Sequence, residues 1–124
     1  MILGIGCDIV RVERVERAAK NERFLIRVYT EAERTYAVQC GRAGAASLAA
    51  RFAGKEAVLK AFGTGLRGGT LHDVEILPGA LGVPEVHLYG YFAARAAEMG
   101  VTRIWITLSH EKEYATAYCM LEGQ

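Results

Sequence analysis

Residues 45–62 read AASLAARFAGKEAVLKAF and form the longest stretch of helical character in the chain. Alanine and leucine, which have high helix propensity, dominate it, and the glycine-rich segment 63–65 ends it. At 100° per residue, Leu48, Phe52 and Leu59 lie within about 40° of one another, and small residues cover most of the opposite side. A helix that is apolar or small all round has no solvated face. The stretch therefore predicts a long buried helix.

Strands and shorter helices are predicted on both sides of this helix. Runs of β-branched and apolar residues indicate strands, and apolar positions at helical spacing indicate helices. The predicted strands are 2–10, 71–77, 85–89, 103–109 and 114–121, and the other predicted helices are 11–20, 24–28, 31–39 and 91–99. This order lacks regular β-α-β alternation, which favours an α+β fold with a largely antiparallel sheet packed on the long helix.

Two local signals sharpen these predictions. Thr30 followed by Glu33 is a capping-box pattern, so a helix is expected to begin at residue 31. Gly4 and Gly6 interrupt the first apolar run, which reads as a buried strand that another element approaches closely.

Composition and charge limit the class of protein. A length of 124 residues fits one domain over residues 1–124, and 52% apolar residues suffice for one packed core, which excludes intrinsic disorder. A formal charge of +1 argues against a nucleic-acid partner. We expect no membrane association, because no run approaches roughly 18 apolar residues and no basic leader opens the chain. Three scattered cysteines without a Cys-x-x-Cys pair indicate a reducing, cytoplasmic location.

The long helix also carries charged side chains that a buried helix would normally exclude: Arg51, Lys55, Glu56 and Lys60. Buried charges are costly unless they are paired or bind an ion or ligand. Glu56 and Lys60 are four residues apart, so their side chains share a face of the helix and could meet one reacting group. A simple helix ion pair worth a few tenths of a kcal/mol is the alternative.

Asp8 lies inside the first apolar strand, where a carboxylate must find a helix cap, a salt bridge or a metal. One interpretation is that Asp8 caps the next helix near Arg11. If Asp8 and Glu56 converge instead, two carboxylates with water and phosphate oxygens favour magnesium over zinc.

Four motifs together resemble the holo-[acyl-carrier-protein] synthase family of phosphopantetheinyl transferases. They are Gly4–Val10, Arg51–Ala57 with Lys60, Phe62–Gly65 and Leu108–Glu111, and the resemblance extends from Gly4 to about Leu121. It implies the phosphopantetheinyl-transferase fold in its single-copy, trimer-forming form, with active sites at the subunit interfaces. It also implies transfer of phosphopantetheine from coenzyme A to a serine of apo acyl carrier protein, with magnesium and release of 3',5'-ADP, in fatty acid biosynthesis.

The resemblance further implies a role for individual residues. Asp8 and Glu56 match the magnesium carboxylates, and Lys60 matches the lysine near the pyrophosphate, so these three are the implied catalytic residues. The positions that match the coenzyme A site are Arg51, Gly63, Thr64, Gly65, Ser109 and His110. A structural hydrogen-bonding role stays open for His110, and the base that takes the serine proton is either a metal-bound water or Glu56 acting through water.

Basic charge gathers in residues 11–27, which hold six basic and three acidic side chains, a net charge of +3. Arg11, Arg14, Arg17 and Lys20 recur every third residue and would form a stripe that orients an acidic carrier protein. A solvated helix face with ion pairs is the alternative interpretation. The resemblance places carrier-binding side chains at Arg14, Arg23, Phe24 and Arg27.

The chain departs from the family pattern at three positions. Gly54 replaces a usual alanine, Thr107 a usual serine and Val83 a usual lysine, and the last change removes a charge from a loop that borders the expected ligand. His72 and His87 match no motif. Two other function classes compete: a docking domain without turnover, and the broad-specificity transferases, which resemble a doubled version of this unit.

Overall fold

The computed structural model describes residues 1–124. Its elements, in chain order, are β1 (Ile2–Arg11), α1 (Val12–Ala18), α2 (Glu22–Val28), α3 (Glu31–Gln39), α4 (Gly44–Phe62), β2 (Val74–Pro78), β3 (Pro84–Leu88), α5 (Gly90–Met99), β4 (Val101–His110) and β5 (Tyr114–Gly123). Short 3-10 turns occupy Gly41–Ala43 (η1), Leu71–Asp73 (η2) and Ala80–Gly82 (η3).

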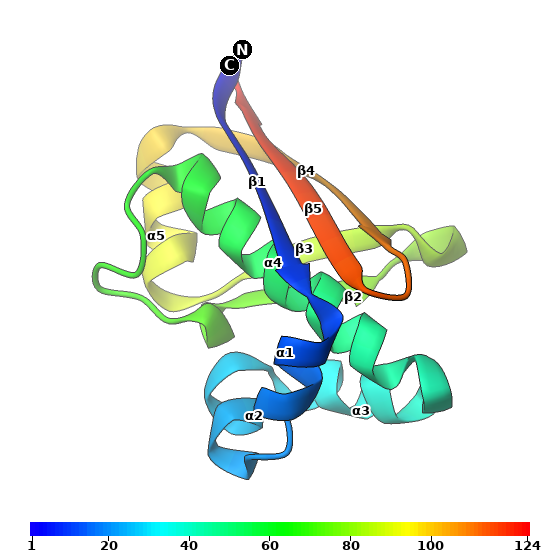
Figure 1. The fold of residues 1–124 in the computed structure, drawn as a ribbon. Helices are drawn as coiled ribbons and strands as arrows, with labels where there is room; N and C mark the ends of the chain where they lie inside the picture. Colours follow the sequence, from blue (N-terminus) through cyan, green and yellow to red (C-terminus); the bar gives the residue numbers. More distant parts are fainter.

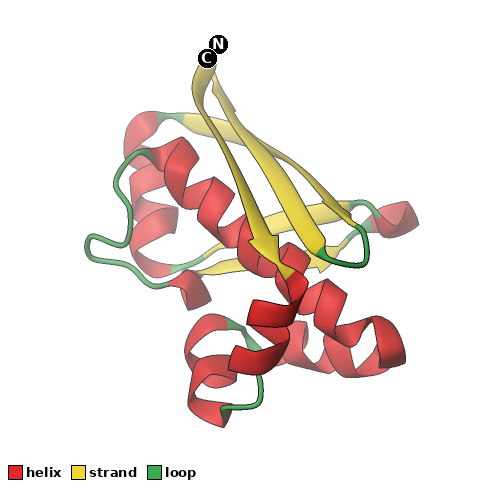
Figure 2. Ribbon diagram, in the orientation of Figure 1, coloured by secondary structure: helices red, strands yellow, loops and turns green.

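The strands form two antiparallel sheets. One has the order β1-β5-β4, and the other is the β2-β3 hairpin. Helix α4 lies across one face of the three-stranded sheet, and α1, α2 and α3 gather at the end of that sheet away from the chain termini (Figure 1). The helices lie on one side of this sheet (Figure 2). The predicted α+β class, with antiparallel strands packed on a long helix, is confirmed.

Glycines in β1 allow α4 to approach it closely. A Cβ atom added at Gly4 would overlap the carbonyl oxygen of Ala61, and one added at Gly6 would overlap that of Ala57. No side chain larger than hydrogen fits at either place unless the helix moves. The prediction that another element approaches these glycines is confirmed, and that element is α4.

The two faces of the three-stranded sheet differ. Toward α4, β5 presents Ala115, Ala117, Cys119 and Leu121, all of which are buried. The opposite face is uncovered, and its side chains include Ile5 and Ile9, which are 70% and 62% exposed. The prediction that the first strand is buried is therefore wrong for one of its two faces.

Some helices and strands begin or end at residues other than those predicted. The capping box of Thr30 and Glu33 is present and α3 spans the predicted residues. The predicted strand at 71–77 begins only at Val74, because Thr70 and Asp73 cap the η2 turn before it. The first helix ends at Ala18 rather than residue 20. None of the helices has both the length and the apolar character that crossing a membrane requires.

Candidate active site

Asp8, Glu56 and Lys60 come together where β1 crosses α4. Asp8 lies on the helix-facing side of β1, opposite Ala117 of β5. The ammonium group of Lys60 donates hydrogen bonds to Oδ1 of Asp8 at 3.1 Å and to the carbonyl oxygen of Cys7 at 3.0 Å. The Asp8 side chain is 20% exposed and that of Lys60 is 56% exposed, so the cluster is open to solvent on the lysine side.

These contacts decide between the alternatives that the sequence left open. The N-cap residue of α1 is Arg11, and no side chain caps that helix, so Asp8 is not a helix cap. Lys60 forms its ion pair with Asp8 on β1 rather than with Glu56 one turn away on its own helix. The pair therefore links the strand to the helix.

Glu56 is half-buried beside this pair. Burial raises the pKa of Glu56 above its ordinary value of 4.5, the negative charge of Asp8 raises it further, and the charge of Lys60 opposes the shift. The hydrogen bond to Asp8 and the charge of that carboxylate raise the pKa of Lys60. The cluster thus holds two carboxylates against one cation, which leaves it with an uncompensated negative charge.

The donor set of the cluster fits a magnesium ion. Two carboxylates are the hard oxygen ligands that Mg²⁺ prefers, and it commonly takes its remaining ligands from water and from substrate phosphates. The chain brings no three side chains of His, Cys, Asp or Glu together into a metal-binding group, so protein side chains would supply only part of the coordination shell.

The other charged residues of α4 are held inside the protein. Arg51 is 6% exposed, donates from Nε to the carbonyl oxygen of Ile76 at 2.9 Å and lies over the ring of Tyr36. Lys55 is fully buried and pairs with Glu33 of α3. Sequence reasoning identified Glu33 only as part of a capping box, because no local pattern predicts its contact with a lysine 22 residues away.

Apart from the buried Arg51, the predicted coenzyme positions occupy two separate places. Gly63 and Gly65 follow Lys60 at the end of α4, where both adopt positive φ angles of 76° and 61°. Ser109 and His110 end β4 and are exposed, and Ser109 pairs with Thr116 on the uncovered face of the sheet. Within one chain, neither of these two residues joins the Asp8 cluster.

Comparison with known proteins gives this arrangement a family. Residues 4–119 match the sequence model of the 4'-phosphopantetheinyl transferase superfamily. The chain belongs to this superfamily. Relatives named holo-[acyl-carrier-protein] synthase are 46% identical in Desulforudis audaxviator, over 99% of this chain and 95% of that protein, and 45% identical in Halorhodospira halophila, over 98% of each.

Solved structures agree with this membership of the phosphopantetheinyl transferases. The holo-[acyl-carrier-protein] synthase of Neisseria meningitidis superposes with a TM-score of 0.89 at 36% identity, over 98% of this chain and 99% of that one. That of Bacillus anthracis, in complex with coenzyme A (3',5'-ADP), gives 0.83 at 32% identity, over 100% and 99%. The resemblance drawn from the four motifs is confirmed.

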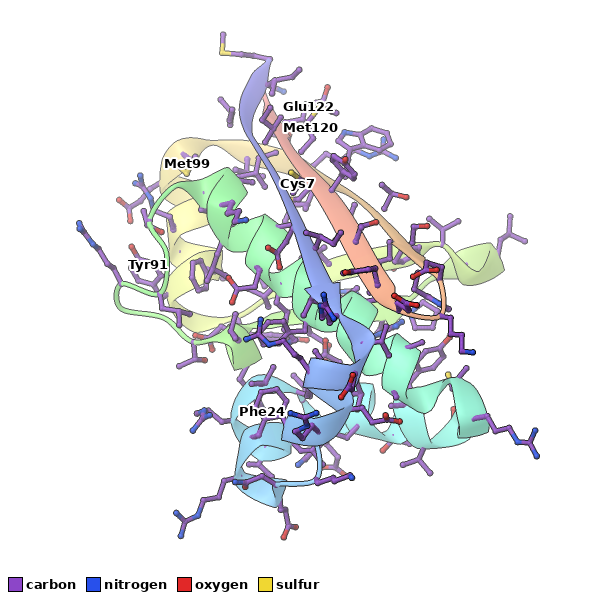
Figure 3. All side chains as sticks on the ribbon, viewed as in Figure 1. Cys7, Phe24, Tyr91, Met99, Met120 and Glu122 are labelled. Carbon is purple, nitrogen blue, oxygen red and sulfur yellow. The ribbon has the colours of Figure 1, made fainter.

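In this phosphopantetheinyl transferase, the basic side chains of α1 and α2 are exposed. Arg14, Arg23 and Arg27 form no ion pair, whereas Arg17 pairs with Glu13 at 2.6 Å. The predicted stripe of basic side chains is wrong in part. Arg11 is the N-cap of α1 rather than a member of the helix, and α1 ends at Ala18, before Lys20. Phe24, which Figure 3 labels, is half-buried. Its ring stacks on that of Phe52 with centroids 6.2 Å apart.

Proposed function

We propose that this chain transfers 4'-phosphopantetheine from coenzyme A to a serine of apo acyl carrier protein and releases 3',5'-ADP. The observation that carries the proposal is the cluster of Asp8, Glu56 and Lys60 at the crossing of β1 and α4. The names of the full-length relatives support it, and so does the coenzyme A complex of the Bacillus anthracis neighbour.

Each member of the cluster has a defined task in this reaction. Asp8 and Glu56 would hold Mg²⁺, which when bound neutralises charge on the pyrophosphate. Lys60 has a flexible, exposed stem, so its ammonium group exchanges Asp8 for a phosphate oxygen and neutralises negative charge as it develops. Positioning and charge neutralisation dominate phosphoryl transfer, so this small set of groups suffices.

The proposed bond changes involve the serine and the coenzyme. The serine oxygen attacks the β-phosphorus of coenzyme A and forms a new P–O bond to it. The bond from that phosphorus to the oxygen bridging to the α-phosphate breaks, and 3',5'-ADP leaves with the bridging oxygen on its 5'-phosphate. The serine proton passes to a base. Burial and the nearby charge of Asp8 raise the pKa of Glu56, which fits a proton acceptor that acts through water.

The coenzyme-binding residues that we propose are Arg51, Gly63, Thr64, Gly65, Ser109 and His110. The loop that follows Lys60 and the end of β4 lie on different parts of the chain, so a site shared between subunits would bring both to one coenzyme molecule. We therefore propose a homotrimer whose active sites lie between neighbouring copies.

The uncovered sheet face supports this assembly. Its side chains form three rows across β1, β5 and β4: Ile5, Met120 and Trp105; Cys7, Tyr118 and Thr107; Ile9, Thr116 and Ser109. Tyr118 and Trp105 are 61% and 41% exposed. A large apolar surface of this kind is characteristic of a subunit interface. Figure 3 labels Cys7 and Met120 on this sheet.

The exposed arginines of α1 and α2 would bind the acidic carrier protein. Arg14, Arg23 and Arg27 form no ion pair within the chain and supply the charge, and the half-buried ring of Phe24 supplies an apolar contact. We place the reaction in fatty acid biosynthesis in the cytoplasm, where thiols such as those of this chain stay reduced.

Mass spectrometry of an apo acyl carrier protein tests the proposal. Incubation with this chain, coenzyme A and magnesium is expected to add the mass of one phosphopantetheine to the carrier. The variant Glu56→Gln is expected to abolish this increase, and Glu98→Gln, which changes an exposed carboxylate on α5, is the matched control. Binding of carrier and coenzyme A without any mass increase would refute the transferase and identify a docking domain.

A further inference from the structure

The ion pair between Lys55 and Glu33 is the most deeply buried charged contact of the chain. Both side chains are 0% exposed, and Nζ of Lys55 lies 2.8 Å from Oε1 of Glu33. Lys55 immediately precedes Glu56 in α4, although it takes no direct part in the cluster with Asp8. Its partners lie on the other side of the helix from β1, on α3 and around β2.

Every hydrogen-bonding group of this pair is used. The ammonium group of Lys55 donates to Glu33, to the carbonyl oxygen of Leu71 at 3.0 Å and to that of Val74. The carboxylate of Glu33 also accepts from the backbone N–H of Thr30 at 2.9 Å and from that of Ile76 at 2.8 Å. One pair thus joins the start of α3, the middle of α4, the η2 turn and β2.

Stability alone is a poor explanation for such a pair. Removing two charges from water costs several kcal/mol per ion, and well-packed apolar residues in their place are often as stable or more stable. The hydrogen bonds and the ion pair of Lys55 are directional, so they can fix the orientation of α4, which apolar packing does not do here. Helix α4 is apolar or small nearly all round, so no apolar stripe fixes its rotation about its own axis.

Rotation of α4 bears directly on the site. Asp8 belongs to β1, whereas Glu56 belongs to the helix, so the separation of their carboxylates changes when the helix turns. Successive side chains on a helix differ by about 100°, so anchoring Lys55 toward α3 and β2 fixes the direction of Glu56. On the strand side, the close contact at Gly6 sets how near the helix comes to β1.

We propose that Glu33 and Lys55 are a positioning pair, which fixes the rotation of α4 and thereby the spacing of Asp8 and Glu56. The pair touches neither substrate nor metal. The inference rests on the proposed function, since the spacing matters only if these carboxylates act together.

Two variants test this role. Glu33→Gln combined with Lys55→Met removes both charges and leaves no unpaired buried charge. Glu33→Asp keeps both charges but shortens the carboxylate, which then cannot reach all of its partners without moving α4. The readout is direct binding of Mn²⁺, as a probe for Mg²⁺, measured calorimetrically without substrate, together with thermal unfolding and transfer kinetics.

Folded variants are expected to bind Mn²⁺ about 10- to 100-fold more weakly than the parent, the usual effect of losing groups that orient metal ligands. The kcat for transfer is expected to fall with it, while the KM for the carrier protein stays unchanged. The control is Tyr89→Phe, which removes a hydrogen bond to Glu75 and leaves the pair intact, so it is expected to change neither quantity.

The possible outcomes separate this inference from the proposed function. Variants that fold normally and keep parental Mn²⁺ affinity and kcat would overturn the positioning role. Failure of both variants to fold would assign the pair to stability and would also overturn the positioning role. A parent chain that binds no Mn²⁺ would overturn that role as well. A parent that binds Mn²⁺ but transfers nothing would refute the transferase alone, because the variants still report on positioning through Mn²⁺ affinity.

Discussion

Lys55 and Glu56 are neighbours in the chain, yet their surroundings give them different chemistry. Burial lowers the pKa of Lys55, and the adjacent Glu33 carboxylate opposes that shift, so the ammonium group is held by partners that solvent does not reach. Glu56 is only half-buried and faces a second carboxylate, which raises its pKa. The first side chain is therefore fixed, and the second is available to a ligand.

The raised pKa of Glu56 predicts a pH-dependent cost to stability in the metal-free chain. A carboxyl group with a raised folded-state pKa binds its proton more tightly in the native state, so ionisation destabilises the fold. The cost is absent below the ordinary value of 4.5 and complete once the pH exceeds the raised value. We expect Glu56→Gln to melt at a higher temperature than the parent at neutral pH and at the same temperature in acid.

Thermal unfolding with a chelator, between about pH 4 and about pH 8, measures this difference. Adding magnesium is then expected to raise the melting temperature of the parent but not that of Glu56→Gln, because only the parent keeps both carboxylates. A variant that melts below the parent at neutral pH without metal would show that Glu56 is stabilised as the anion.

At the scale of elements, the packing around α4 distinguishes two glycines, Gly6 of β1 and Gly54 of α4 itself. At Gly6 an added Cβ would overlap the Ala57 carbonyl oxygen, which belongs to the helix backbone and cannot move alone. At Gly54 it would lie 2.6 Å from Cδ1 of Ile76, the end of a flexible side chain. The first substitution displaces an element, whereas the second displaces the ends of the Ile76 and Leu108 side chains.

We therefore expect Gly6→Ala to reduce the free energy of unfolding by about 1–3 kcal/mol or more and to impair activity, because it separates Asp8 from the helix. Gly54→Ala is expected to be nearly neutral, since about 1 kcal/mol of helix propensity offsets the shift of Ile76. Urea unfolding of both variants compares the two costs, and equal losses would contradict the distinction.

The exposed arginines of α1 and α2 carry a prediction about substrate binding. Charge reversal at Arg14 or Arg27 is expected to raise the KM for the carrier protein more than the KM for coenzyme A, and rising salt is expected to slow transfer. Arg42→Glu makes the same charge change on the η1 turn and serves as the control. Equal effects on both substrates would remove the docking role of these helices.

The sequence predicts elements well where the signal is local. The capping box at Thr30 gave the start of α3, and the all-round apolar character of residues 45–62 gave the burial of α4. The charges of α4 and β1 also singled out Asp8, Glu56 and Lys60, which the structure brings together. It did not find the partner of Lys55, because the contact with Glu33 depends on how α3, α4 and β2 pack and not on any spacing within one element.

For the whole molecule, the uncovered face of the three-stranded sheet predicts self-association. Ile5→Lys places a charge in the first row of that face and is expected to yield a smaller particle by light scattering, with loss of transfer because the proposed sites lie between subunits. Val38→Lys makes the same change at a position on α3 that is 80% exposed and is expected to do neither. A parent that stays monomeric and fully active when dilute would contradict the shared site.

The thiol of Cys7 provides a chemical probe of the proposed assembly. Its thiol is exposed in the middle row of the uncovered face, Cys40 is half-buried at the end of α3, and Cys119 is buried on the side toward α4. Burial raises the pKa of Cys119 to about 12, so that thiol is inert to alkylating reagents. If copies meet through the sheet, Cys7 becomes shielded while Cys40 is unaffected. The rate at which one cysteine per chain is labelled would then fall as protein concentration rises.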